Sequence, residues 1–368
     1  MATLVVCLDG TNQTWDQPHP SNIVLCFKSL GGTPTLISNG SYETTFPVAA
    51  PGTGKYLPGV GTQGDPALKL LGDAFGDGIA EPIVRGYTFL SRAYNPGDRI
   101  FITGFSRGAT AARALAGFVS GRGLLNRATY DPSQASGAYL RGIAAWSLYR
   151  GQPFSAGVAT ALDSIAADQG GAMPKLTAAD FTPIPPIEAV GVYDTVSSLG
   201  VPILGLNGDA SFAYTIINTD LSPNVARGFH ALAADETRDL FAPTYWTARA
   251  RIEQRVFPGA HSNVGGGYPE RGLSDGALKW MMERLSGVGM PYQPALLPLA
   301  PNPSDTARDD GETLPFVLTP RHARQFPLSA LSDPSIAARR NGPPVIKLPN
   351  LTPGPYIPVG GYVGGGAL

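Results

Sequence analysis

Four short, nearly continuous apolar runs constrain the fold of this chain more than any other feature. Each run has five to seven residues and is bounded by Gly, Asp or Pro, and the four are Thr3–Leu8, 99–103, Ile187–Tyr193 and Ile252–Phe257. Such runs are typical of strands buried on both faces of a parallel sheet. Segments of helical periodicity lie between several of them, as in 81–94, which ends at Asn95-Pro96-Gly97. We therefore predict an α/β fold with a mainly parallel sheet flanked by helices.

The length of 368 residues and the 43% of hydrophobic residues suffice for one large domain with insertions or for two smaller domains. We predict one α/β domain over residues 1–290. Within it, the Ala-rich stretch 127–183 is a helical insertion that either covers a site or pads the fold. Proline dominates after residue 290, so we expect residues 291–368 to be an irregular extension packed on the core, with little chemistry of its own.

The composition excludes several classes of function. A formal net charge of −1 gives no electrostatic reason to expect nucleic acid as a partner. The two cysteines, Cys7 and Cys26, are expected to be free buried thiols. No run of His, Cys or carboxylates has metal-ligand spacing, so neither metal nor cofactor is expected. The chain shows no signal peptide and no apolar run near 18 residues, which predicts a protein that is cytoplasmic as synthesised.

The pentapeptide Gly104-Phe105-Ser106-Arg107-Gly108 follows one apolar run directly and opens a helix predicted over 106–119. A serine on a sharp strand-to-helix turn has a strained backbone. Side chains two residues to either side would collide there, so glycine is required at both positions. The turn places the hydroxyl at the positive end of a helix, where developing anionic charge is favoured. We predict that Ser106 is a nucleophile.

A serine hydroxyl needs a base to take its proton, and the chain has four histidines. His19 and His322 are expected in exposed loops. His230 is expected in a helix-like segment as a satisfied buried histidine. His261 instead follows the run Ile252–Phe257 on a glycine-rich loop, from which it can reach over the sheet edge. His261 is therefore the predicted base.

The acid should lie between the serine and the histidine in the chain. Asp194 directly follows the run Ile187–Tyr193, so its carboxylate can accept the Nδ1–H of the base and hold its tautomer. Asp220, Asp235 and Glu236 satisfy the same order but follow strands less directly. Asp194 is therefore the predicted acid.

An oxyanion hole needs two backbone donors, one of them from the residue after the nucleophile, here Arg107. We predict the second donor in the loop after the first apolar run, at the amide of Gly10 or Thr11. Asp9, which precedes them, is alternatively a structural carboxylate that ties this loop to neighbouring amides.

Six stretches occur together in a characteristic order. They are LDGTN (8–12), GVGT (59–62), PGDR (96–99) leading into GFSRGA (104–109), GVYDTV (191–196), DETR (235–238), and FPGAH (257–261) through Gly267-Tyr268. In this combination the chain resembles the lipase and phospholipase catalytic domain of bacterial type VI secretion effectors, long described as a domain of unknown function. The resemblance covers about residues 1 to 285. It implies the roles already predicted for Ser106, Asp194 and His261. It also implies ester cleavage, often of phospholipid acyl chains, with transient contact with a membrane surface and delivery by a specialised secretion system.

The sequence therefore predicts an α/β-hydrolase-like serine esterase or lipase that acts on a small ester or a lipid. Two alternatives stay open: a non-lipid esterase or polyester depolymerase, and a non-catalytic binding protein on a hydrolase fold. Two other motifs are rejected. Asp9-Gly10-Thr11 lacks the second carboxylate of a haloacid-dehalogenase phosphatase because Cys7 occupies that position, and 51–55 lacks the Ser/Thr of a P-loop because Tyr56 replaces it.

Overall fold

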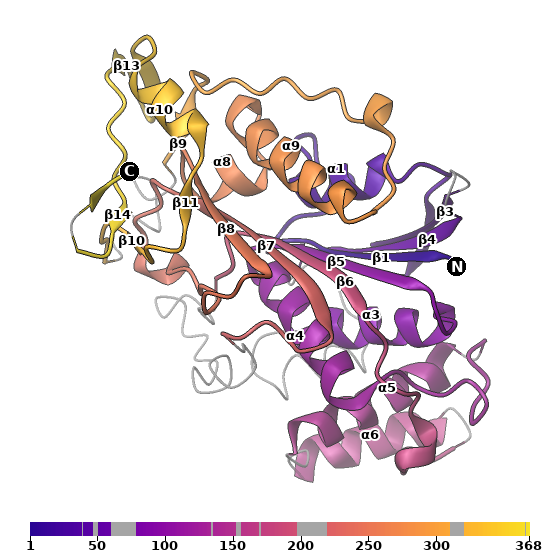
Figure 1. The fold of residues 1–368 in the computed structure, drawn as a ribbon. Helices are drawn as coiled ribbons and strands as arrows, with labels where there is room; N and C mark the ends of the chain where they lie inside the picture. Colours follow the sequence, from indigo (N-terminus) through magenta and orange to yellow (C-terminus); the bar gives the residue numbers. More distant parts are fainter. Residues whose placement is uncertain are drawn as a thin grey trace.

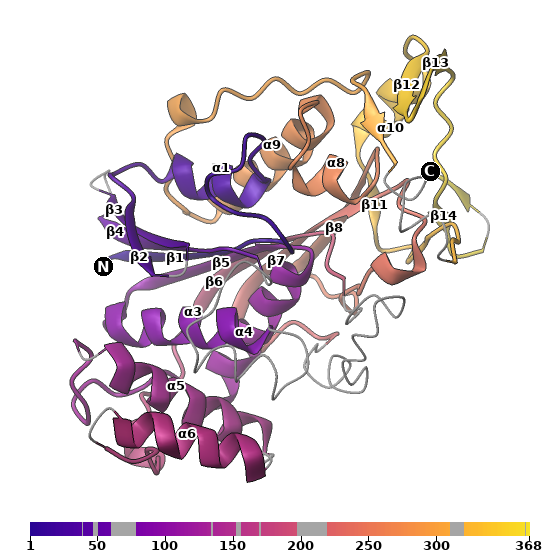
Figure 2. The same cartoon turned by 180° about the vertical axis from the view of Figure 1, so that it is seen from behind.

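The computed structural model describes residues 1–38, 40–46, 51–59, 79–133, 135–151, 156–168, 171–196, 219–309, 320–364 and 366–368. The described residues form a central nine-stranded sheet in the order β11-β8-β7-β6-β5-β1-β4-β3-β2, with helices on both faces (Figure 1 and Figure 2). Neighbouring strands from β11 to β4 are parallel, and β3 and β2 continue the sheet in antiparallel fashion. The predicted α/β class with a mainly parallel sheet is therefore confirmed.

The main-sheet strands are β1 (Thr3–Leu8), β2 (Thr35–Ser38), β3 (Ser41–Phe46), β4 (Gly52–Leu57), β5 (Arg99–Phe105), β6 (Ile187–Tyr193), β7 (Val225–Ala233), β8 (Ile252–Phe257) and β11 (Leu331–Ser332). The α-helices are α1 (Asn22–Ser29), α3 (Ala80–Ala93), α4 (Arg107–Arg122), α5 (Ala135–Arg150), α6 (Ala156–Asp168), α8 (His261–Gly265), α9 (Gly272–Gly287) and α10 (Pro334–Arg340). Six further short strands lie in the C-terminal part: β9 (Ala307–Arg308), β10 (Gln325–Phe326), β12 (Val345–Leu348), β13 (Asn350–Gly354), β14 (Gly361–Tyr362) and β15 (Gly366–Ala367). None of the described helices is both long and apolar enough to cross a membrane.

Alternate residues of the central strands face opposite helical layers. In β1, Leu4 and Val6 belong to the core shared with α3 and α4, whereas Val5 and Cys7 belong to the core shared with α1 and α9. A strand with helices on both faces must be apolar at every position. This is why the buried strands appear in the sequence as continuous apolar runs.

The helices of the stretch 127–183 form an outer layer beyond α3 and α4 (Figure 1). Helix α5 packs on α3 and on the C-terminal half of α4, where Tyr149 lies directly against Gly117 and Gly121. The opposite end of α4 follows Ser106. The described contact of α5 with α4 is therefore made far from the Ser106 end of α4.

The extension after residue 290 contains more regular structure than the sequence predicts. Strand β11 pairs in parallel with β8 at the edge of the main sheet, and six other short strands form two small sheets. These strands have two to five residues, too few to leave a periodic signal among the prolines. Phe326 and Ile336 of the extension pack against Leu232 and Val256 of the main sheet in one apolar cluster.

A buried carboxylate joins three elements at the end of β1. Asp9 Oδ1 accepts the Gly10 amide at 2.8 Å, and its Oδ2 accepts the hydroxyls of Ser21 at 2.7 Å and Tyr56 at 2.8 Å. Ser21 is also the N-cap of α1, where its Oγ accepts the amide of Val24. Burial raises the pKa of Asp9 to about 6, although the three hydrogen bonds oppose that rise. Asp9 is thus a structural carboxylate that ties this loop to its neighbours, as the sequence analysis considers.

The raised pKa of Asp9 predicts a specific pH dependence of stability. Because its folded-state pKa of about 6 lies above the ordinary 3.8, the folded chain holds this proton more tightly than the unfolded chain does. Stability from this group is therefore full below pH 4 and is lost as the pH rises through about 6. Between pH 4 and 7 the free energy of unfolding of the wild type should fall by up to about 3 kcal/mol relative to that of Asp9→Asn, because asparagine cannot titrate. Urea unfolding across this range measures the difference, and parallel curves for the two proteins would contradict the prediction.

Candidate active site

The three predicted site residues follow the carboxyl ends of parallel strands. Ser106 comes directly after β5, Asp194 directly after β6, and His261 begins α8 shortly after β8. Phe105 of β5 pairs in register with Tyr193 of β6, so the first two residues leave the sheet side by side. Since parallel strands end at a common edge, that edge is where ligands bind in folds of this kind.

Ser106 occupies a strained backbone conformation. Its φ is 58° and its ψ is −124°, a region that costs about 1–3 kcal/mol for a residue with a side chain. The Ser106 amide donates to the carbonyl of Tyr193 at 3.0 Å, which holds the turn against β6. A Cβ on Gly104 would lie 2.3 Å from the carbonyl oxygen of Gly108, and a Cβ on Gly108 would lie 2.3 Å from the carbonyl oxygens of Leu8 and Asp9. Both glycines are therefore required by close backbone approach, as the sequence predicts.

The structure brings His261 and Asp194 into direct contact. His261 Nδ1 lies 2.6 Å from Asp194 Oδ2, and both side chains are almost fully buried. The imidazole contacts two aromatic rings, with centroids 4.7 Å away for Phe105 and 4.8 Å away for Phe241. Its Nε2 is buried and has no hydrogen-bond partner in the described part of the chain. The Nδ1 contact leaves this second nitrogen to act as a base.

Phe105, the neighbour of Ser106, links the nucleophile turn to His261, and no hydrogen bond joins Ser106 to His261 in the described part of the chain. The ring of Phe105, the neighbour of Ser106, contacts the His261 ring, and it also abuts Gly265 of the same short helix α8. In free enzymes the hydrogen bond between nucleophile and base is often long and tightens only when substrate binds. The absence of this hydrogen bond therefore does not argue against His261 as the base of Ser106.

Arg324 is a site residue that the sequence analysis missed. Its Nη1 donates to Asp194 Oδ1 at 2.7 Å and its Nη2 to Oδ2 at 3.0 Å, a bidentate ion pair. Burial acts to raise the pKa of Asp194, but Arg324 and then His261 outweigh it and hold this pKa below its ordinary value. Arg324 lies in the extension for which little chemistry was expected. No local motif marks it, because its partner lies 130 residues away in the sequence.

The other three histidines have different surroundings. His230 is a satisfied buried histidine, as predicted, but it lies in strand β7 and not in a helix, so that part of the prediction is wrong. Its Nε2 accepts the amide of Thr195, and its Nδ1 lies 3.3 Å from Gln254 Oε1. Burial, helped by nearby Arg113, lowers the pKa of His230 to about 3, so it is neutral. His19 is exposed, and His322 is exposed and paired with Asp239.

The competing carboxylates bind groups other than the imidazole of His261, although Glu236 accepts the His261 backbone amide at 3.3 Å. Asp235 accepts the amides of Gly259 and Val359 and the hydroxyl of Tyr356. Glu236 forms a buried bidentate pair with Arg238. Asp220 forms an exposed pair with Arg249. Of the four carboxylates considered in the sequence analysis, Asp194 is the one that contacts the imidazole of His261.

The loop after β1 touches the nucleophile turn. A Cβ on Gly10 would lie 3.3 Å from Ser106 Cβ, and the Arg107 side chain donates to Thr11 Oγ1. The amides of Gly10 and Thr11 are the two predicted second donors of the oxyanion hole. Of these, the Gly10 amide already donates to Asp9. Val60-Gly61-Thr62 of the GVGT stretch lies outside the described residues, whereas Gly59 donates to the carbonyl of Gln13 in this loop.

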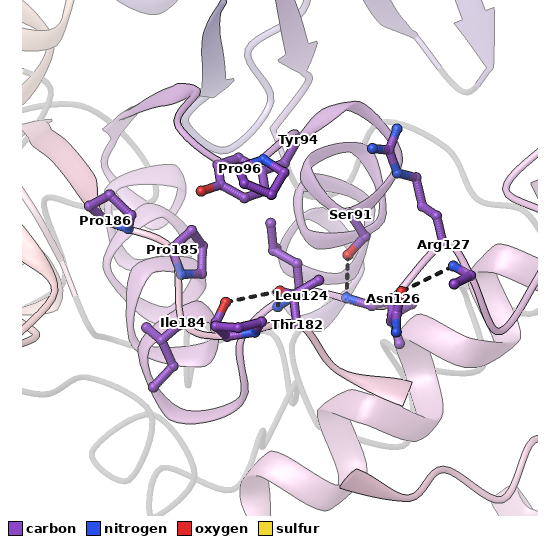
Figure 3. Close-up of a pocket in the computed structure, with 13 residues that line it drawn as sticks. Ser91, Tyr94, Pro96, Leu124, Asn126, Arg127, Thr182, Ile184, Pro185 and Pro186 are labelled. Carbon is purple, nitrogen blue, oxygen red and sulfur yellow. Dashed lines mark hydrogen bonds between the residues drawn. The ribbon is translucent and has the colours of Figure 1, made fainter. Parts of the chain in front are cut away.

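A cavity of about 370 Å³ lies away from these residues. Figure 3 shows that Tyr94 and Pro96, which precede β5, face Thr182 and Pro186, which precede β6. The cavity is therefore at the amino ends of the strands, opposite the edge that carries Ser106. We assign it no part in the chemistry.

Three known proteins are similar to parts of this chain. "Uncharacterized protein YEL023C" of Saccharomyces cerevisiae is 30% identical over 137 residues, which are 34% of this chain and 18% of that protein. An uncharacterized protein from Pseudomonas aeruginosa of known structure has a TM-score of 0.42 and 16% identity, over 80% of this chain and 47% of that one. The Tle1 effector bound to the VgrG spike of the type 6 secretion system has a TM-score of 0.40 and 18% identity, over 73% and 52%. The chain thus spans about half the length of these two structures and less of the yeast protein.

Residues 2–284 match the family described as "T6SS, Phospholipase effector Tle1-like, catalytic domain". The match begins before β1, ends within α9 and includes all three residues predicted as nucleophile, acid and base. It covers well over half of the chain, in agreement with the resemblance described above. The chain therefore belongs to the Tle1-like phospholipase effector catalytic domain family of the type VI secretion system.

Proposed function

We propose that this chain is a serine acyl hydrolase that cleaves carboxylic esters of lipids, with Ser106, His261 and Asp194 as nucleophile, base and acid. The observation that carries the proposal is the hydrogen bond between His261 Nδ1 and Asp194 Oδ2, with Nε2 left without a partner beside the strained Ser106 turn. A base needs one nitrogen oriented and the other available. Family membership adds the lipid, with phospholipid as the leading substrate class.

In the first half of the reaction, His261 Nε2 takes the proton of Ser106 as the hydroxyl attacks the ester carbonyl. The resulting oxyanion accepts hydrogen bonds from the amide of Arg107, at the start of α4, and from that of Thr11. We prefer Thr11 to Gly10 because the Gly10 amide is bound to Asp9. Each such donor typically contributes about 3 kcal/mol to the stability of the transition state.

His261 then returns its proton to the leaving alcohol, and departure of the alcohol completes the acyl-enzyme. In the second half, a water molecule attacks the acyl-enzyme with His261 again as base, and His261 passes this proton to the Ser106 oxygen as the carboxylic acid leaves. Asp194 stays ionised throughout and stabilises the imidazolium. The formal net charge of −1 offers no attraction for nucleic acid, so a small ester or a lipid remains the proposed partner. Transient contact with a membrane surface and delivery by a type VI secretion system are part of the same proposal, because the family consists of such effectors.

Replacement of the nucleophile provides the first test. Ser106→Ala should lower kcat/KM for short p-nitrophenyl esters by at least about 10⁴-fold. Alanine keeps the Cβ and loses only the hydroxyl, so the thermal unfolding temperature should stay near that of the wild type. Undiminished hydrolysis by the pure, folded variant would end the assignment.

The chain offers a matched control for the base, because His322 and Asp239 also form a His–Asp pair, in which His322 is largely exposed. His261→Ala should lose at least about 10³-fold in kcat, whereas His322→Ala should keep the wild-type rate. Labelling of Ser106 by a fluorophosphonate probe should show the same contrast. Equal losses in the two variants would refute the role of His261.

The substrate class is tested by a hydrolysis panel of short esters, triglyceride emulsions, phospholipid vesicles and polyester particles. The proposal expects the highest kcat/KM on phospholipid vesicles, with the release of acyl chains lost in step with labelling of Ser106 by the probe. Turnover confined to short esters or to the polyester would instead identify a non-lipid esterase or a depolymerase. Failure of every substrate and of the probe would favour a non-catalytic binding protein.

A further inference from the structure

Arg324 connects the C-terminal extension to the proposed catalytic acid. The residue lies beyond the family match, which ends at residue 284, and directly precedes β10. Its guanidinium contacts both oxygens of Asp194 and is itself fixed by two carbonyls, those of Ala233 at 2.9 Å and Phe241 at 2.6 Å. Four hydrogen bonds thus hold a planar group in one orientation against the carboxylate.

The carboxylate depends on this arrangement because it is sealed from water. Asp194 is 0% exposed and Arg324 is 6% exposed. Besides Arg324, the donors to its side chain are His261 Nδ1 and the amide of Ala233. An ionised group buried at this depth needs a counter-charge, and a bidentate guanidinium also fixes its rotation. If the carboxylate turned, its Oδ2 would leave Nδ1 of His261.

We propose that Arg324 is a positioning residue of the catalytic centre, which acts through Asp194 and gives the C-terminal extension a direct part in catalysis. This inference rests on the proposed function. Arg324 orients the carboxylate so that one oxygen receives Nδ1–H of His261, and it supplies the positive charge that keeps the buried carboxylate ionised. Its contacts are with the acid and with carbonyls of the fold.

The charge of Arg324 should also set the acidic limit of activity. The other titratable or charged groups that face the pair are His230, Glu236 with its partner Arg238, and Tyr245. None of them supplies a second cation in contact with Asp194, because Arg238 is paired with Glu236 and His230 is neutral. Without Arg324, the largest opposition to burial would be lost and that of His261 would remain, so the pKa of Asp194 would rise.

The experiment compares Arg324→Met and Arg324→Lys with the control Arg339→Met. Arg339 is the matched residue, since it is a buried arginine of the same extension that donates to the carbonyls of Pro303 and Asp305. Folding is checked by circular dichroism, and kcat and KM for a short p-nitrophenyl ester are measured from pH 5 to 9. A control variant with wild-type kcat separates general loosening of the extension from the role of Arg324.

For Arg324→Met we expect at least about a 10²-fold loss in kcat, little change in KM, and an acidic limb of kcat/KM that moves up by about one pH unit. Arg324→Lys should keep the acidic limb near that of the wild type, because the charge remains, but lose about tenfold in kcat because one ammonium cannot hold both oxygens. Added guanidinium should restore part of the activity of Arg324→Ala.

Unchanged kcat in Arg324→Lys, or an equal kcat loss in Arg339→Met, would overturn the inference. So would an acidic limb that stays in place in Arg324→Met. If Arg324→Met does not fold, the lysine variant alone decides the outcome through its kcat. These outcomes are distinct from failure of the proposed function, in which the wild type itself would show no turnover and no labelling of Ser106.

Discussion

The buried carboxylate of Asp194 is the group on which the rest of the site depends. Removing an ionised carboxylate from water costs several kcal/mol unless its oxygens are fully satisfied. Here four donors satisfy them: the amide of Ala233 in β7, the imidazole of His261 and both Nη atoms of Arg324. The ion pair therefore cannot form until the end of the main sheet and the C-terminal extension are in place.

Three carboxylates that follow parallel strands show how the hydrogen-bond donors around a buried acid determine the direction in which its pKa is shifted. Asp9, Asp194 and Asp235 follow β1, β6 and β7, and all three are buried. The side chains of Asp9 and Asp235 accept from neutral amides and hydroxyls, and burial raises both pKa values. Asp194 has a guanidinium, and its pKa is lowered. The proposed catalytic acid thus stays ionised, whereas the other two are suited to tying loops together.

The sequence predicts those parts of the structure that are determined by residues close together in the chain. A strand, a glycine, a serine and a helix within ten residues specify the turn at Ser106, and a carboxylate at the end of a buried strand marks Asp194. The position of Arg324 could not be predicted, because a single arginine in a proline-rich stretch has no pattern that distinguishes it from a solvated one. The sequence analysis predicts a helix at His230, although its apolar neighbours fit a helix or a strand. Pairing with β6 and β8 makes this segment a strand.

The boundary of the catalytic unit follows from these contacts. Residues 2–284 carry the family match, but β8 would be an open sheet edge without β11, and Asp194 would be a buried charge without Arg324. Asp235 likewise holds the extension through Tyr356 and Val359. An ion pair, a strand pairing and a set of hydrogen bonds thus join the extension to the same end of the sheet. The extension therefore supplies contacts on which the matched region depends, and without it Asp194 would lose its guanidinium partner.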